Sequence, residues 1–281
     1  MLTHTFVHIP GIGLKTEKRL WRAGVFTWRD WESEKYSMVA RGDSGSLNAY
    51  LEESWDFLQR RDPTFFSKRM SAGLQWRFFP EFRDETVYLD IETTGLSNWE
   101  NEITTIALYD GKSVYYYING ENLEQFPEDI LRYSVVVTYN GRSFDIPFIE
   151  RYFHIHIPCA HIDLRYILHS LGLKGGLKGC ERALGLHRGD LEGVDGYFAV
   201  LLWQEYMRRQ NVKALETLLA YNIADVMSLE TLMITAFNLK LKETPFAGLL
   251  DMEKPRMPEN PFAADKDTIF RIRNYLTKRG I

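Results

Sequence analysis

The spacing of hydrophobic and polar residues is most regular between residues 84 and 240. Apolar and β-branched residues are concentrated in three consecutive segments, 85–92, 102–110 and 112–119. The dipeptides DG and NG mark turns beside these segments. This pattern predicts three strands that follow one another as an antiparallel meander.

A different pattern follows the meander. The apolar run at 134–140 is typical of a strand that is buried on both faces. A helix is expected at 145–153, where Pro147 falls in the first turn, and a short strand near 161–164. Apolar residues then recur at helical spacing, which predicts helices at 165–171, 177–185, 197–209 and 212–238. Strands followed by helices predict an α/β domain over 84–240.

The first 83 residues predict a small, mainly helical N-terminal region. A short strand-like run at 6–9 comes first. The aromatic segment 74–82 is expected to pack this region onto the sheet of the next domain. Helices are expected at 14–23, 28–32 and 44–60.

Positive charge in this chain is expected to be local. The net charge is −4 and the pI is about 6.0, so composition alone does not indicate binding to a polyanion. Residues 241–281 contain a Pro-rich linker and then a basic amphipathic helix at 266–279. This C-terminal segment either packs back on the domain or stays mobile.

The cysteines and the N-terminus bear on the compartment. The two cysteines show neither a CxxC pair nor a zinc-ligand spacing. The N-terminal residues lack the pattern of a signal peptide, and no apolar stretch has the length expected of a membrane span. We therefore expect a cytoplasmic protein without a membrane partner.

The motif DIETTG at 90–95 carries the strongest chemical signal. Side chains two residues apart on a strand point to the same face, so Asp90 and Glu92 project together while Ile91 faces the other side. Two carboxylates on one face repel each other unless a cation or a proton intervenes. Oxygen ligands of this kind suit Mg²⁺. On its own, a DxE pair more often lies on the solvated surface and has no catalytic role.

Two further motifs supply a carboxylate each. Asp145 closes NGRSFD, at the end of the apolar strand where open α/β sheets place their sites; the alternative is a simple helix cap. Tyr221 and Asp225 in YNIAD share one face of a helix; the alternative is a surface pair. The three motifs in this order favour a shared site.

In this order, DIETTG, NGRSFD and YNIAD resemble the three exonuclease motifs of the DEDD superfamily, in its tyrosine (DEDDy) branch, and the wider chain resembles the YprB-like group of RNase H-like proteins. The resemblance implies an RNase H-like mixed β-sheet flanked by helices and two metal ions. It implies that Asp90 bridges both ions and that Glu92 and Asp225 complete the shell of the first. Asp145 would reach the second ion, largely through water, and Tyr221 would help to hold the attacking water.

The same resemblance implies a function. We expect 3′→5′ hydrolysis of single-stranded nucleic-acid ends with Mg²⁺ or Mn²⁺, with DNA preferred over RNA. Thr93 and Leu96 are expected to contact the terminal nucleotide, although Leu96 could equally pack the turn. Two alternatives stay open: a structure-specific endonuclease on the same fold, and a nucleic-acid-binding module without activity.

Two glycine-rich segments are further candidates. HIPGIGLKTEKRLWRAG resembles the hairpin and second helix of a helix-hairpin-helix element, in which Gly11, Gly13 and Lys15 would contact the DNA backbone. The first helix of such an element has no counterpart here, so a structural turn or a protein-interaction role is the alternative. GLKGGLKG at 172–179 is either a phosphate-contacting loop or a flexible connector.

Overall fold

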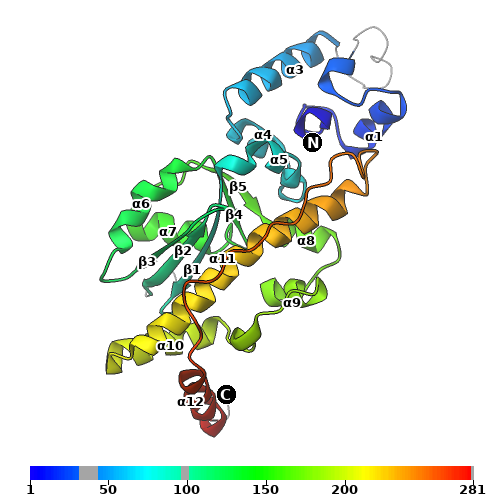
Figure 1. The fold of residues 1–281 in the computed structure, drawn as a ribbon. Coiled ribbons are helices and arrows are strands. Elements are labelled where there is room, and N and C mark those ends of the chain that lie inside the picture. Colours follow the sequence, from blue (N-terminus) through cyan, green and yellow to red (C-terminus); the bar gives the residue numbers. More distant parts are fainter. Residues whose placement is uncertain (32–43, 96–100, 280–281) are drawn as a thin grey trace.

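The computed structural model describes residues 1–31, 44–95 and 101–279. Its centre is a five-stranded sheet with the order β3-β2-β1-β4-β5 (Figure 1). β1 pairs antiparallel with β2, and β2 with β3, whereas β1–β4 and β4–β5 are parallel. The strands are β1 (Thr86–Thr93), β2 (Ile103–Tyr109), β3 (Val114–Ile118), β4 (Val135–Thr138) and β5 (Ala160–Asp163). The predicted α/β class, the mixed sheet and the antiparallel meander are therefore confirmed.

Alternation along β1 sends its side chains to two separate cores. Val87, Leu89 and Ile91 lie in a hydrophobic cluster with residues of α7 (Asp145–Phe153). Tyr88, from the other face, lies in a second cluster that includes much of the long helix α11 (Val212–Leu241). Because the side-chain period of a strand is two, Asp90 and Glu92 also face α11.

Helices cover both faces of the sheet (Figure 1). Besides α7, the helices between β3 and the end of α10 are η5 (Leu123–Gln125), α6 (Phe126–Asp129), η6 (Ile130–Arg132), α8 (Leu164–Ser170), α9 (Gly176–Ala183), η7 (Gly189–Leu191) and α10 (Gly196–Arg209), where η denotes a 3-10 helix. The helices expected from the sequence in this region are all present, and α9 begins at Gly176, one residue before the helix expected at 177–185 and inside the glycine-rich segment 172–179.

α11 is longer and more apolar than the sequence pattern suggested. Among the described residues it is the one helix whose length and hydropathy would allow it to cross a membrane. The expectation that no stretch has this length was wrong. However, 94% of the relevant window is buried inside the protein, where α11 packs against β1 and β2. Its apolar character follows from this position in the core.

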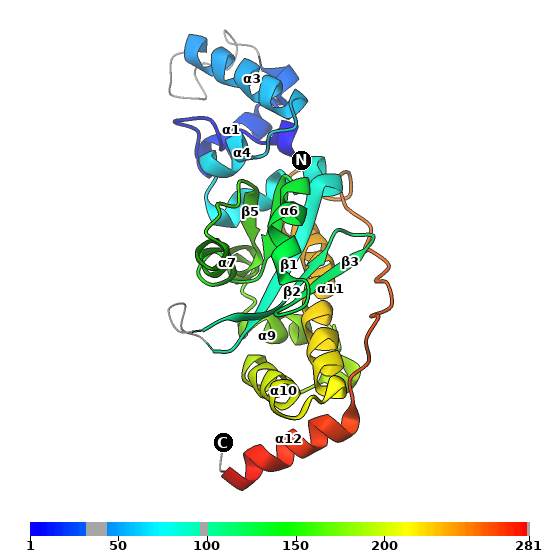
Figure 2. The same ribbon diagram turned by 90° about the vertical axis from the view of Figure 1, so that its left-hand side faces the viewer.

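The N-terminal helices form a group at one end of the molecule, and α12 lies at the other end (Figure 2). The aromatic segment that joins the N-terminal helices to the sheet is buried, as expected. Trp76, Phe78 and Phe79 are almost fully covered, and Trp76 packs edge-on against Phe237 of α11. The proposed boundaries at 83 and 240 stay a prediction. The N-terminal elements are η1 (Leu2–His4), α1 (Leu14–Arg22), η2 (Trp28–Asp30), α3 (Ser44–Gln59), α4 (Thr64–Arg69), η3 (Ala72–Arg77), α5 (Phe79–Phe82) and η4 (Arg83–Glu85).

The strand-like run at 6–9 forms no strand in the structure. The amides of Phe6 and Val7 donate to one carboxylate oxygen of Glu17, at 2.7 and 3.3 Å. Glu17 is itself buried in an ion pair with Arg77 at 2.9 Å. The backbone groups of this segment are therefore satisfied by a side chain, and no partner strand is needed.

The C-terminal segment packs back along α11 (Figure 1). Asn238 of α11 exchanges two hydrogen bonds with the backbone of Met252, at 2.8 and 2.9 Å. Farther along, Asn260 donates to the carbonyl of Ala220 at 2.8 Å. The segment leads into α12 (Lys266–Arg279), whose residues Ile269 and Ile272 are buried. Of the two expected outcomes for this segment, packing is the one observed.

Candidate metal and active site

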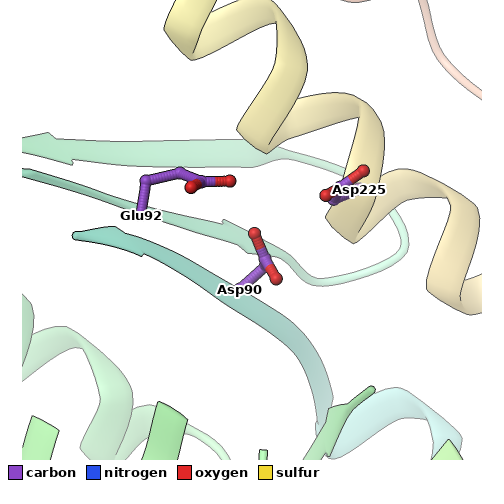
Figure 3. Close-up of side chains that lie close together, drawn as sticks. All are labelled: Asp90, Glu92 and Asp225. Atoms are coloured by element: carbon purple, nitrogen blue, oxygen red, sulfur yellow. The ribbon is translucent and has the colours of Figure 1, made fainter. Parts of the chain in front are cut away.

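Three of the predicted carboxylates come together between β1 and α11. Asp90 and Glu92 project from the same face of β1, and Asp225 projects from α11 toward them (Figure 3). One oxygen of each residue can be chosen so that all three lie within 4.8 Å of one another. Glu92 and Asp225 are buried, with 7% and 4% of their surface exposed. A cluster of oxygen donors at this spacing is suited to a hard divalent cation.

Asn222 holds Asp90 in place. Its side-chain amide donates to Asp90 Oδ2 at 2.7 Å, while its carbonyl oxygen accepts from Thr105 Oγ1 at 3.0 Å. Asn222 is fully buried, and its hydrogen bond with Thr105 is buried with it, whereas the bond to Asp90 reaches the partly exposed edge of the cleft. This residue lies within YNIAD, one position after Tyr221, and the sequence reasoning missed it. Its position one helical turn before Asp225 could have identified it from the sequence as a candidate for the site.

Asp145 lies in the same cleft but is held differently. It is the first residue of α7, and no side-chain hydrogen bond caps that helix. Its carboxylate accepts instead from the backbone amide of Ile91, at 3.2 Å. Asp145 is therefore more than a helix cap: it is tied to the strand that carries Asp90 and Glu92. It is not a member of the three-carboxylate group.

Tyr221 and Asp225 share a helix face, as predicted, and two cations pack against them. The Lys178 ammonium lies 4.7 Å from the centre of the Tyr221 ring, and the Arg188 guanidinium lies 5.7 Å from it. Arg188 also forms an ion pair with Asp225 and a two-pronged pair with Glu181, at 2.6 and 2.8 Å. Arg188 was missed from the sequence because no motif marks it; Lys178 belongs to the glycine-rich segment.

Burial and mutual repulsion raise the pKa of every acid in the site. The pKa values of Asp90 and Glu92 lie well above the ordinary range, first because of burial and then because of the neighbouring Asp225. Burial raises the pKa of Asp145 to about 7. Burial also raises the pKa of Asp225, and the Arg188 guanidinium opposes this shift. A bound cation would relieve the cost of ionising these groups together.

The four carboxylates and Tyr221 line one open cleft, here called the acidic cleft, with a volume of about 670 Å³. The end of β1 and the two residues after it form one side, through residues 90–95, and α10 forms another through Gly196, Tyr197 and Val200. The cleft is large enough to admit part of a polymer as well as metal ions.

The predicted nucleic-acid contacts are not all in this cleft. Thr93 lines it, with its hydroxyl bonded to the carbonyl of Gly95 at 2.5 Å, whereas Leu96 falls outside the described residues. Gly11, Gly13 and Lys15 lie beside or within α1, at the end of the molecule away from α10 (Figure 2). Gly11 has a φ of 83°, which favours glycine. The structure does not bring the PGIG turn to the carboxylates.

Comparisons with known proteins match the central region. A search of curated protein sequences found no match. Among solved structures, the chain is similar to the family B DNA polymerase from the archaeon Pyrobaculum calidifontis, with 14% identity, a TM-score of 0.42, and coverage of 56% of this chain and 24% of the polymerase. The chain thus spans about a quarter of that polymerase. It is also similar to NrnC of Brucella melitensis with bound Mg²⁺, with 15% identity, a TM-score of 0.40, and coverage of 59% and 77% of the two chains.

A protein-family model also matches the central region of the chain. The model of the RNase H superfamily matches residues 87–237, which is more than half of the 281-residue chain and includes all five strands, α7 and nearly all of α11. Together with the mixed sheet described above, this match shows that the chain belongs to the RNase H superfamily.

Proposed function

We propose that this protein is a metal-dependent nuclease that degrades single-stranded nucleic acid from the 3′ end, with DNA preferred over RNA. The observation that carries the proposal is the group of three carboxylates, Asp90, Glu92 and Asp225, whose oxygens lie within 4.8 Å of one another in an open cleft. Membership in the RNase H superfamily supports it. The 3′→5′ direction rests on the resemblance of the motifs to the DEDDy branch.

In this proposal the site would take two ions, Mg²⁺ or Mn²⁺, and the three-carboxylate group supports at least one of them. Asp90, Glu92 and Asp225 would hold the first, with Asp90 shared between the ions. Asp145 would serve the second, because its carboxylate lines the same cleft. When bound, such ions would lower the pKa of a water and offset negative charge on the phosphate and the leaving oxygen. The residues around the cleft then have to hold the ligands, the water and the strand in place.

Asn222 and Arg188 would hold two of the metal-binding carboxylates in place. Asn222 orients the Asp90 carboxylate through its 2.7 Å hydrogen bond. The Arg188 guanidinium pairs with Asp225 and favours its ionised form, which is the form that binds a cation. Partners of this kind typically tune the affinity of a metal site.

Tyr221 would act as a neutral phenol. Burial, and then the charges of Asp225 and Glu92, raise its pKa far above the ordinary value. The hydroxyl therefore keeps its proton and donates a hydrogen bond to a water or a phosphate oxygen, and it does not serve as a base. Its place among the residues that line the acidic cleft allows this role.

Two further contacts with nucleic acid belong to the proposal. Thr93 and Leu96, at the end of β1 and just beyond it, would meet the terminal nucleotide. Gly11, Gly13 and Lys15 would bind a phosphate backbone at the N-terminal end of α1, where free amides and an exposed lysine favour an anion.

The test is a degradation time course on 5′-labelled single-stranded DNA and RNA, with Mn²⁺ or EDTA. The variants are Asp90→Asn and Asp225→Asn, and Asp84→Asn is the matched control because Asp84 is exposed and outside the cleft. We expect a metal-dependent ladder that shortens from the 3′ end, lost in the first two variants and kept in the control. Internal cuts would indicate the endonuclease instead, and binding without cleavage would indicate an inactive module.

A further inference from the structure

One face of α10 connects the acidic cleft to a second cavity. Tyr197 and Val200, in the first half of the helix, line the acidic cleft. Arg208 and Arg209, at its end, line a groove of about 200 Å³ between α10 and α12. Gln204 lines both. Because Tyr197, Val200, Gln204 and Arg208 recur at intervals of three and four residues, they lie along one side of the helix, and Arg209 is adjacent to its end.

The groove between α10 and α12, here called the basic groove, carries a local excess of positive charge. Arg208 and Arg209 come from α10 and Arg271 from α12. Glu205 is the one acid among the residues that line it, and it pairs with Arg209 at 3.4 Å and with Arg271 at 3.0 Å. Arg208 is exposed and has no ion pair with any described residue. The groove therefore presents a net positive charge in a chain whose net charge is −4.

Exposed aromatic side chains flank this path. Tyr197 beside the acidic cleft is 51% exposed, and Tyr275 in the basic groove is 47% exposed. Exposed aromatic rings beside arginines suit a single strand, whose bases stack on the rings while its phosphates meet the cations. An acidic peptide would use the arginines but would gain little from the rings.

We propose that the basic groove binds the single-stranded nucleic acid whose end is processed in the acidic cleft. This inference rests on the proposed function and extends it to the path of the substrate. From Tyr197 to Arg208 the helix advances about 16 Å at 1.5 Å per residue, which corresponds to roughly five nucleotides at a stacked spacing of 3.4 Å. A strand longer than this reaches the arginines, and a shorter one stays within the cleft.

The length dependence gives a direct test. Binding of fluorescein-labelled oligothymidylates of 4 and 12 nucleotides is measured by anisotropy in EDTA, so that no strand is hydrolysed. The double variant Arg208→Gln/Arg271→Gln should lose roughly 10-fold in affinity for the 12-mer, should lose less for the 4-mer, and should show a salt slope smaller by about 1.4, or 0.7 per phosphate contact. The control Lys112→Gln/Arg132→Gln removes two exposed cations outside the groove and should behave as wild type.

A second variant works in the opposite direction. Glu205→Gln removes the acid that partly neutralises Arg209 and Arg271, so it should tighten binding of the 12-mer and steepen its salt dependence. Misfolding cannot mimic a gain of affinity. Surface ion pairs contribute little to stability, and melting temperatures confirm that each variant is folded.

The outcomes separate this inference from the proposed function. Equal affinities in the groove variants and the control would overturn the groove, even if the protein degrades DNA. Wild-type protein that hydrolyses no strand but binds the 12-mer through these arginines would refute the nuclease and leave the groove standing. A polyglutamate peptide that binds as tightly as the 12-mer and competes with it would overturn the assignment to nucleic acid.

Discussion

Replacing Asp145 with asparagine should stabilise the metal-free protein, and the gain should grow with pH. Asparagine keeps the shape of the side chain and the oxygen that accepts the 3.2 Å hydrogen bond from Ile91. It removes the charge and replaces the other carboxylate oxygen with an amide nitrogen. In the folded protein, burial raises the pKa of the Asp145 carboxyl from 3.8 to about 7. Ionisation of this group therefore opposes folding whenever no cation compensates it.

The size of the effect follows from proton linkage. As pH rises, the unfolded chain loses the Asp145 proton near pH 3.8 while the folded protein keeps it until about pH 7. Over this window the folded state binds more protons, so stability falls as pH rises. A difference of about 3 pKa units, at about 1.4 kcal/mol each, amounts to about 4 kcal/mol above pH 7. At pH 5 only about 2 kcal/mol has been lost.

Urea unfolding in EDTA at pH 5 and pH 8, followed by circular dichroism, measures this difference. Asp145→Asn should exceed wild type in unfolding free energy by about 2 kcal/mol at pH 5 and about 4 kcal/mol at pH 8. The exposed Asp84→Asn should show no such trend. Mn²⁺ at pH 8 should close the gap, because it stabilises the carboxylate and not the amide. A gain of equal size at both pH values, or a loss, would mean that ionisation of Asp145 does not oppose folding.

Two further substitutions test the site, and a third tests the turn at Gly141, within the NGRSFD segment that carries Asp145. Arg188→Gln should lower the unfolding free energy in EDTA by about 3 to 5 kcal/mol, because Asp225 loses its buried partner; an unchanged urea midpoint would contradict this. Asn222→Ala should weaken Mn²⁺ binding in calorimetry by about 10-fold or more, because Asp90 loses the hydrogen bond that orients it; unchanged affinity would count against that role. Gly141→Ala should cost about 1 to 3 kcal/mol in thermal unfolding, since an added Cβ would lie 2.3 Å from a threonine hydroxyl; a wild-type melting temperature would mean that the turn adjusts freely.

Local periodicity was sufficient to predict most of the elements around the site. The strands of the meander and the helix at 145–153 appear where the pattern placed them. The prediction of a strand failed at 6–9, where two backbone amides of the apolar run donate hydrogen bonds to the carboxylate of Glu17 and not to a partner strand. It also stopped α11 at Asn238, whereas the helix continues to Leu241. Such errors arise where a distant side chain or the surrounding core decides the local conformation.

Local sequence was enough to place Asp90 and Glu92 on one strand face and Tyr221 and Asp225 on one helix face. The reason is the fixed geometry of the backbone, with a period of two in a strand and 3.6 in a helix. The folded chain was needed to see that the two faces meet, that Asp145 is tied to Ile91, and that Arg188 pairs with Asp225. Such contacts join residues far apart in the chain, and they depend on how α11, α7 and the loop after α9 pack around β1. No local pattern encodes that packing.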